Sequence, residues 1–586
     1  MTSGYEISGK DIENIKITNT FTHNPGVTVQ SSEYIFAVAS KSDNIKLHIR
    51  SVKDSVDGFV VQLNSSYKQG DVFSFSLSGR KIEGYAYYFE DETGSFCDPY
   101  ARRCIRIDDV CEKKYAGIIF GQETHVMSGR RKSIPANELI MYKLHVRGFT
   151  KDRFSKVKNK GSFSGLAEKI PYMKDLGINA VELMPAYEFF DNKEIHNFWG
   201  YSNGLYFTPK IAYCSTKDPV KEFGDMVNSF HENGMDVYME MFFPADVPVA
   251  MTVNCLRYWH EFYGVDGFHL ICDERKISAI AEDAFLADIK ILATSFNETY
   301  ENTHLIEYHN GFLEVARRLI KGDEGMLQKF IDAMKKNPSQ GGIVNYIANN
   351  NGFTLNDVYS YDRKHNEENG EGNRDGSDYN ISWNCGVEGP TRKKSINELR
   401  QLLARNAMAM LMTAQGIPLI YAGDEFLNSQ NGNNNAYCQD NETGWVNWNQ
   451  CVKNSRFRDF VRELIEFRKG HKCLHMENEP YLTDFKHLGQ PDVSYHGCKA
   501  WYPDLENYNR HIGILTCGAY TDENEDVYVL YNMHWEPHDL ALPVRKDGRW
   551  KIVMSTGRLP NQPEEQDKCI EIAARTIVIL VSEKNS

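Results

Sequence analysis

The sequence predicts a (β/α)₈ barrel between two β-sandwiches, and three patterns lead to this fold class. Short apolar or alternating segments, separated by turn residues, fill the chain up to about residue 134 and are typical of a sandwich. The same pattern returns after about residue 486. Between these regions strand-like and helix-like segments alternate, which implies parallel strands with helical crossovers. We therefore expect three domains, over residues 1–134, 135–485 and 486–586.

Bulk composition narrows the class of protein and of ligand. The chain has 586 residues, 41% of them apolar and 25% charged, as in soluble globular proteins of several domains. The formal net charge of −14 argues against nucleic acid or an anionic membrane as a partner. Neither a signal peptide nor a long apolar segment is visible, so we expect a cytoplasmic protein.

The cysteine pattern gives no sign of a metal site. The 13 cysteines are scattered, and although Cys97, Cys104 and Cys111 recur every seven residues, no Cys-x-x-Cys or histidine cluster accompanies them. We interpret them as buried reduced thiols. No metal and no cofactor are expected.

The two sandwiches are predicted from short strands. In the first, strand-like segments occupy residues 34–40, 45–50, 59–63, 72–77 and 85–89, and residues 98–101 begin a connector. In the second, they occupy residues 512–515, 527–531, 540–542, 550–553 and 570–581. Sequence alone does not separate a ligand-binding sandwich from one that only braces its neighbour.

Seven barrel strands are visible, and an eighth is inferred. Strand candidates lie at residues 139–146, 179–185, 235–243, 264–274, 303–308, 343–348 and 418–423, with residues 303–308 counted as the fifth strand. Helical spacing marks residues 166–176, ended by Gly177, and residues 279–296 and 396–410; Asp218 and Pro219 open a further helix. Two long polar insertions, 354–395 and 424–448, contain Trp383, Trp445 and Trp448, which indicates packed loops.

Loop motifs give these regions a family resemblance. Residues 365–389, 422–426 and 432–441, together with 145–150, 181–185 and 198–201, resemble the isoamylase and glycogen-debranching branch of the α-amylase superfamily of glycoside hydrolases. The resemblance implies that the first sandwich is similar to a starch-binding-type module and that residues 531–537 belong to a C-terminal β domain. It also implies α-glucan as the ligand, in the form of glycogen, amylopectin or maltooligosaccharide.

Such enzymes need a carboxylate nucleophile and a carboxylic acid about 5–5.5 Å apart. The family's nucleophile motif, Gly-Phe-Arg-Phe-Asp, corresponds to residues 267–271, which places His269 at the arginine and Ile271 at the nucleophile. The family's His-Asp pair, which supplies a third carboxylate, corresponds to Asn350 and Asn351. The acid aligns with Tyr308. No catalytic position is intact in this alignment.

Two other carboxylates are candidates for replacing the lost groups. Glu307 precedes Tyr308, and a shift of one residue along a strand turns the side chain to the opposite face unless a bulge corrects it. Asp273 shares strand parity with Ile271, but it lies about 6–7 Å further along the strand. The other interpretation of Asp273 is that it caps the following helix.

The first functional hypothesis is a catalytically inactive homologue that acts as a glucan-binding or regulatory subunit. It would bind glucan through Trp199, Tyr201, His269, Asn350 and Trp383. Its partner would be an active isoamylase-type subunit or a second copy of the chain. Two alternatives stay open: an active α-1,6-glucosidic debranching hydrolase with relocated carboxylates, and a purely structural interaction protein.

Overall fold

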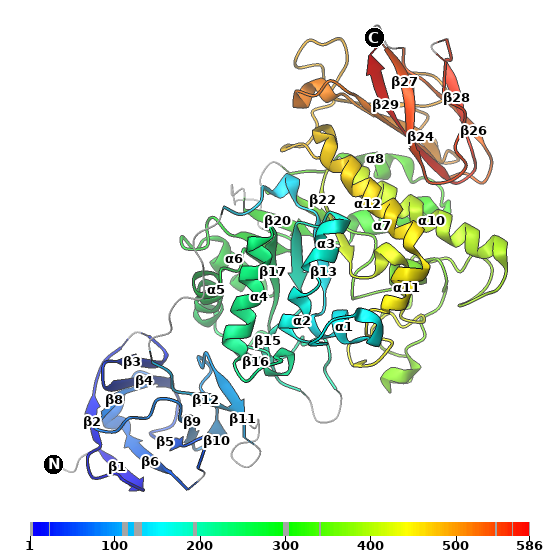
Figure 1. Cartoon of the computed structure of the whole chain (residues 1–586). Helices are drawn as coiled ribbons and strands as arrows, with labels where there is room; N and C mark the ends of the chain where they lie inside the picture. Colours follow the sequence, from blue (N-terminus) through cyan, green and yellow to red (C-terminus); the bar gives the residue numbers. More distant parts are fainter. Residues whose placement is uncertain are drawn as a thin grey trace.

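Three β-rich bodies follow one another along the chain in the computed structural model (Figure 1). The structure describes residues 4–22, 24–54, 56–107, 115–121, 132–191, 196–296, 304–338, 341–544, 548–564 and 566–584. A sandwich near the N-terminus and another at the C-terminus lie at opposite ends of a closed barrel. The predicted fold class is confirmed.

The N-terminal sandwich consists of two antiparallel sheets around one aromatic and aliphatic core. The seven-stranded sheet contains β1 (Tyr5–Gly9), β6 (Gly58–Asn64), β5 (Asn44–Arg50), β9 (Ala86–Asp91), β12 (Tyr115–Ile118) and β11 (Cys104–Arg106), with β10 (Gly94–Phe96) on β9. The five-stranded sheet contains β2 (Lys16–Asn19), β8 (Val72–Ser78), β4 (Glu33–Ala39) and β3 (Gly26–Gln30), with β7 (Lys68–Gln69) on β8. The expected connector at residues 98–101 is followed by two further strands, β11 and β12. Cys97 and Cys104 are buried thiols, and Cys111 lies outside the described residues.

The barrel is closed by eight parallel strands. In order around it these are β13 (Met141–Leu144), β14 (Ala180–Leu183), β17 (Asp236–Phe243), β18 (Gly267–Cys272), β19 (Lys290–Ala293), β20 (Leu305–Tyr308), β21 (Ile343–Asn345) and β22 (Ile417–Tyr421). A short hairpin of β15 (Tyr187–Phe189) and β16 (Gly204–Pro209) leaves the barrel after β14. Because the strands are parallel, their carboxyl ends meet at one mouth.

The structure corrects the prediction for residues 279–296. A helix was expected there, but α6 covers Glu274–Ala281 and residues 290–293 form β19. This strand is the eighth one that had only been inferred. Residues 303–308 therefore contain the sixth barrel strand and not the fifth, with Thr303 outside the described residues. A four-residue strand is too short to show a period, and helical spacing extended through it by chance.

Helices cover the outside of the barrel (Figure 1). They are α1 (Val146–Lys151), α2 (Phe163–Ala167), α3 (Ile170–Leu176), α4 (Pro219–Glu232), α5 (Val249–Tyr263), α6, α7 (Gly311–Lys321), α8 (Leu327–Lys335), α9 (Leu355–Val358), α10 (Lys394–Thr413), α11 (Trp448–Lys453) and α12 (Ser455–Gly470). The predicted signals hold at α4, where the Asp218 side chain accepts a hydrogen bond from the Lys221 N–H, and at α3, where Gly177 is the left-handed C-cap. Among the described helices, none is long and apolar enough to cross a membrane.

The C-terminal sandwich packs a five-stranded sheet against a two-stranded one. The larger sheet contains β23 (Val493–His496), β24 (His511–Thr516), β25 (Val527–Asn532), β29 (Thr576–Lys584) and β27 (Gly548–Ser555), and the smaller one β26 (His538–Ala541) and β28 (Cys569–Ile572). Asn406 on α10 donates to the Arg575 carbonyl at 2.8 Å and accepts from the Thr556 hydroxyl at 2.5 Å. Buried polar contacts therefore join this sandwich to the barrel.

The end of α10 depends on one buried arginine. Arg468 of α12 is 1% exposed, and its guanidinium donates to the carbonyls of Met412, Ala414 and Gly416. These carbonyls lie in the last turn of α10 or just after it, where helical partners are missing. Arg468 thus fixes the entry into β22.

We predict that Arg468→Leu lowers the free energy of unfolding by about 3 kcal/mol or more, because several buried carbonyls lose their donor. Urea denaturation followed by circular dichroism measures this. Arg462→Leu is the matched control on α12, because Arg462 is more than a third exposed and its Asp175 contact is a surface one. Equal losses in the two variants would contradict the assignment.

Candidate functional site

The carboxyl ends of the barrel strands surround a cavity of about 630 Å³. We call it the mouth. Its lining consists of aromatic and amide side chains with few charges: Lys143, Asn197, Trp199, Tyr201, Glu240, Phe242, His269, Ile271, Thr294, Tyr308, His309, Asn310, Tyr346, Asn349, Asn350, Asn351, Glu371, Asn435 and Tyr437. The size falls within the range of small-molecule sites.

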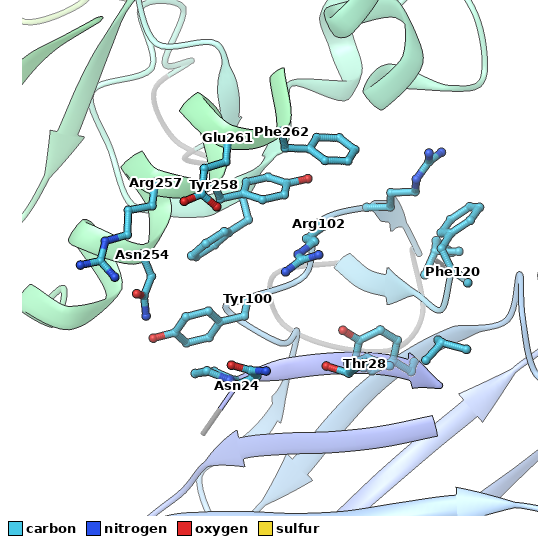
Figure 2. Close-up of a pocket in the computed structure, with 18 of the residues that line it drawn as sticks. Asn24, Thr28, Tyr100, Arg102, Phe120, Asn254, Arg257, Tyr258, Glu261 and Phe262 are labelled. Carbon is cyan, nitrogen blue, oxygen red and sulfur yellow. The ribbon is translucent and has the colours of Figure 1, made fainter. Parts of the chain in front are cut away.

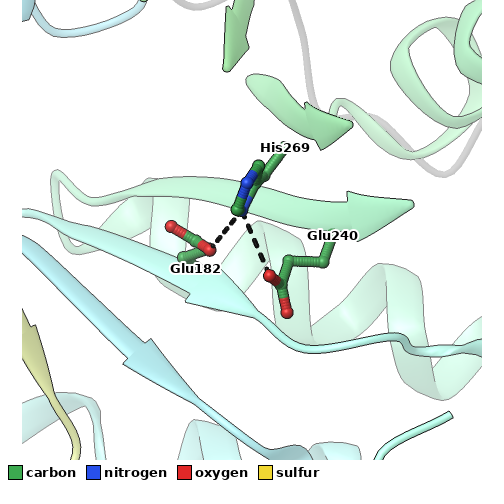
Figure 3. Close-up of side chains that lie close together, drawn as sticks. All are labelled: Glu182, Glu240 and His269. Carbon is green, nitrogen blue, oxygen red and sulfur yellow. Dashed lines mark hydrogen bonds and ion pairs between the residues drawn. The ribbon is translucent and has the colours of Figure 1, made fainter. Parts of the chain in front are cut away.

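A charged network forms the floor of the mouth. Lys143 of β13 lies 2.6 Å from Glu240 of β17 and 3.3 Å from Glu182 of β14, measured from Nζ to Oε1. His269 Nδ1 of β18 lies 2.9 Å from Glu182 Oε1 and 3.1 Å from Glu240 Oε1 (Figure 3). All four side chains are buried. Four neighbouring strands thus each contribute one charged group to a single cluster.

The cluster balances its own charge when His269 is protonated. Burial favours the neutral form of Glu240, but Lys143 and His269 outweigh it and lower the pKa of Glu240 to about 2. Burial lowers the pKa of Lys143, yet Glu240, Tyr201 and Glu182 raise it above its usual range. Two anions and two cations are then paired, as a buried set of charges requires.

The same donor set raises the question of a metal ion. Ligand atoms of Glu182, Glu240 and His269 lie within 4.8 Å of one another. However, the Lys143 ammonium already contacts both carboxylates. A dication placed between them would meet a buried positive charge. The donor set therefore fits an ion network better than a metal centre.

Aromatic groups cover this floor. The Tyr308 ring stacks on His269 with ring centroids 4.0 Å apart. The Tyr201 hydroxyl donates to Glu240 Oε2 at 2.7 Å and accepts from Asn350 Nδ2 at 3.1 Å. Both oxygens of Glu240 are consequently occupied by the protein itself.

Two neighbouring barrel strands end at the mouth in residues without a carboxylate. Ile271 lies at the end of β18 and lines the mouth. Adjacent strands are about 4.8 Å apart, so a partner about 5–5.5 Å from a group on β18 must come from a neighbouring strand. The next strand, β19, ends at Ala293, and Thr294 follows it into the mouth.

This geometry corrects the predicted position of the acid. Tyr308 ends β20, which is separated from β18 by β19. It lines the mouth, but it is two strands away from Ile271. Thr294, and not Tyr308, is the residue that follows the strand next to β18 into the mouth. The error follows directly from the missed strand β19.

The two candidate substitutes point away from the mouth. Asp273 is the N-cap of α6, accepts a hydrogen bond from the Lys276 N–H and pairs with the Lys276 ammonium. Glu307 is paired through β20 without a bulge, and Lys336 donates to it at 2.7 Å. Hydrogen bonds from His309 and Lys336 lower the pKa of Glu307 to about 2, the opposite of what a general acid needs.

Most of the predicted binding residues come together, and one does not. Trp199, Tyr201, His269 and Asn350 all line the mouth, as does the exposed Asn351. Trp383 is absent from the lining. Its ring packs on the outer core, with the Arg575 guanidinium 5.0 Å from the ring centroid.

The sequence interpretation missed Lys143, Glu182 and Glu240. Lys143 and Glu182 are the single charged residues of the otherwise apolar strands Met141–Leu144 and Ala180–Leu183. Glu240 lies among apolar residues inside Asp236–Phe243, whose other charged residue, Asp236, begins the strand. A lone charge in a fully buried strand requires a partner. Three such residues on neighbouring strands therefore indicate a buried ion network.

The two insertions are ordered by contacts with each other. Asn366 Nδ2 donates to Asn434 Oδ1 at 2.9 Å, and Asn433 Nδ2 donates to Asn369 Oδ1 at 2.9 Å. Tyr437 donates to Glu371 at the mouth. These amide pairs hold the asparagine-rich loops as one rim, which agrees with the prediction that they are packed.

The chain is similar in sequence to several known proteins. No family model matches the chain. It is 28% identical to isoamylase 1, chloroplastic, of Oryza sativa over 529 residues, which are 72% of this chain and 64% of that protein. It is 27% identical to isoamylase SU1, chloroplastic, of Zea mays over 84% of this chain and 77% of that protein. A glycogen operon protein GlgX homologue of Mycobacterium tuberculosis is 30% identical over 60% of this chain and 61% of its own length. The chain thus spans less than two thirds of the rice and mycobacterial relatives.

Solved structures agree on the fold. Pullulanase type I from Bacillus subtilis, complexed with maltose, superposes with a TM-score of 0.74 at 17% identity and covers 97% of this chain and 86% of its own. The catalytic module of the pneumococcal glycogen-degrading virulence factor SpuA gives a TM-score of 0.74 at 16% identity, over 97% of this chain and 98% of its own.

We predict that Lys143→Met lowers the free energy of unfolding by about 3–5 kcal/mol, because it leaves two buried carboxylates without their cation. Urea denaturation at neutral pH measures the loss. Lys221→Met is the control, since the Lys221–Asp225 pair is exposed to solvent and surface ion pairs contribute little to stability. A loss below about 1 kcal/mol for Lys143→Met would show that the network does not stabilise the barrel.

A second prediction concerns pH. Burial lowers the pKa of His269, but Glu182 and Glu240 more than compensate and raise it above the ordinary value of 6.5. Its stabilising contribution is therefore complete below pH 6.5 and is lost as pH rises through the folded-state pKa. Urea midpoints measured across this window should fall more steeply for the wild type than for His269→Gln. His475→Gln is the control, because burial lowers the pKa of His475 to about 4 and this histidine does not titrate in the window. The wild-type slope should persist in this variant. A wild-type slope in His269→Gln would refute the assignment to His269.

Proposed function

We propose that this chain, a homologue of isoamylases and GlgX-type glycogen-debranching enzymes of the α-amylase superfamily, binds α-glucan at its mouth without cleaving it. One observation carries the proposal. The only carboxylates among the described lining residues are Glu240 and Glu371, and both are engaged by the protein, Glu240 in the ion network and Glu371 by Tyr437.

Retaining hydrolysis needs a free carboxylate that can attack and a protonated one that can donate. Ile271 and Thr294 supply neither at the ends of β18 and β19. Loss of a nucleophile costs on the order of 10⁴-fold or more in rate, and losses within one catalytic unit do not simply add. Little glycosidase activity is expected from such a site.

The mouth nevertheless keeps features that suit a sugar chain. Trp199, Tyr201 and Tyr437 offer apolar ring surface, and Asn349, Asn350 and Asn435 offer amide donors and acceptors. Neutral hydroxyl groups match such a lining. Asn435 donates through Nδ2 to Asp375 and through its backbone N–H to Asn433 Oδ1, so its position in the wall is fixed before a ligand binds.

A glucan-binding chain that lacks hydrolysis fits the role of a regulatory or scaffold subunit. Its partner would be a catalytically active chain of the isoamylase type, or a second copy of this chain. Binding of one glucan by both subunits would raise the effective concentration of the substrate at the active one. A purely structural protein would instead show no affinity for glucan at all.

The first test is hydrolysis. Pure protein incubated with glycogen and amylopectin should release no new reducing ends above a heat-inactivated sample. Asp273→Asn and Glu307→Gln should leave that result unchanged, because both side chains lie outside the mouth. Release of reducing ends that either substitution abolishes would establish the relocated-carboxylate alternative.

The second test is binding. In isothermal titration with maltoheptaose, Tyr437→Ala should weaken affinity at the mouth about tenfold, since loss of an aromatic contact costs about 1–2 kcal/mol. Tyr379→Ala is the matched control, because Tyr379 also belongs to an insertion but is 60% exposed and outside the mouth. Equal affinity in wild type and Tyr437→Ala would remove the mouth as the binding site.

A further inference from the structure

A second cavity, of about 640 Å³, lies between the N-terminal sandwich and the barrel. We call it the interdomain cleft. One wall is helix α5 of the barrel, and the other is formed by β3 and by the loop before β11 of the sandwich. Figure 2 shows side chains from both bodies converging on the space between them. Ligand sites occur preferentially at such domain interfaces.

The wall on α5 has a regular pattern. Asn254, Arg257, Tyr258, Glu261 and Phe262 line the cleft, and their spacing of i, i+3, i+4, i+7 and i+8 places them on one helix face. The opposite face of α5 carries the fully buried Cys255, Leu256 and Trp259. The helix therefore presents a second face, part aromatic and part polar, toward the sandwich.

Aromatic rings run through the cleft. Tyr258 and Phe262 stack with centroids 5.2 Å apart and planes at 12°. Phe207 lies between Tyr258 and Tyr100 of the sandwich. Its ring centroid is 5.7 Å from that of Tyr258 and 5.0 Å from that of Tyr100. Phe120 adds an exposed ring at the outer end, 41% exposed. Ring surfaces with hydrogen-bonding groups between them match the alternating C–H faces and hydroxyls of a sugar.

Charge at the cleft favours a neutral ligand. Three guanidinium groups line it, those of Arg102, Arg103 and Arg257. Arg103 pairs with Asp218 at 2.8 Å and Arg257 pairs with Asp283, two aspartates outside the lining, and Glu261 is the carboxylate among the described lining residues. An anion would find the charges of Arg103 and Arg257 already balanced by these aspartates. Hydroxyl groups can still use the remaining donors and acceptors.

We propose that the interdomain cleft is a second binding site for a short α-glucan chain, separate from the mouth. The choice of glucan as the ligand rests on the proposed function. A chain bound there would contact α5 and the sandwich together. It would therefore link the sandwich to the barrel through the ligand as well as through the protein.

The test uses the full chain and titrates it with maltotriose and maltoheptaose. The cleft variant combines Phe120→Ala with Arg102→Ala. The matched control combines Phe154→Ala with Arg153→Ala, which likewise removes one exposed ring and one nearby guanidinium but outside the cleft. Phe154 is 42% exposed and its ring centroid lies 4.7 Å from the Arg153 guanidinium, as that of Phe120 lies 4.1 Å from Arg103. Wild type and the control should show a binding site in addition to the mouth, and the cleft variant should lose it or bind at least tenfold more weakly there.

The mouth variant Tyr437→Ala separates the two proposals. If the cleft site exists, this variant keeps the cleft affinity of the wild type, and the combination of cleft and mouth substitutions weakens binding at both sites by about tenfold or more. If Tyr437→Ala alone loses all glucan binding and the cleft variant binds like the wild type, the proposal of a cleft site is wrong and that of a mouth site stands. Persistent binding in Tyr437→Ala that the cleft variant abolishes would overturn the mouth instead. Binding of inorganic phosphate but not of maltotriose at the cleft would overturn the neutral ligand.

Discussion

The network of Lys143, Glu182, Glu240 and His269 is the constraint on which the barrel interior depends. Four strands each place one ionisable group where water is excluded, and with His269 protonated the two carboxylates are balanced by two cations. The groups must therefore occupy the floor together. Once they do, both oxygens of Glu240 already accept hydrogen bonds within the protein, from Lys143 and His269 on one side and from Tyr201 on the other. Charge neutrality inside the barrel and the lack of an available carboxylate at the mouth have the same cause.

The mouth and its rim were largely predictable from the sequence, because they depend on strand ends and on loop motifs. Ile271, Tyr201 and Asn350 lie at the mouth as predicted from their positions after strands. Strand β19 was not predictable, since four residues do not define a period. Because this strand was not recognised, the family's acid was aligned with Tyr308 and not with Thr294, which follows the strand next to β18. One short strand therefore changed the identity of a site residue without changing the fold class.

Contacts between distant segments were beyond the sequence pattern. The pairing of Trp383 with Arg575 joins an insertion of the barrel to the last strands of the chain, and no local signal indicates it. The cleft wall on α5 is an intermediate case. The spacing from Asn254 to Phe262 is visible in the sequence, but only the packed domains show that this face meets the sandwich rather than solvent.

The central proposal is that this chain binds α-glucan and does not hydrolyse it. The most direct measurement recovers the ligand: the protein is incubated with a branched maltooligosaccharide, separated from free sugar by gel filtration, and the co-eluting glucan is sized by mass spectrometry. We expect the glucan that elutes with the protein to have the same mass as the glucan that was added. Shortened chains eluting with the protein, or no glucan eluting with it at any concentration, would contradict it.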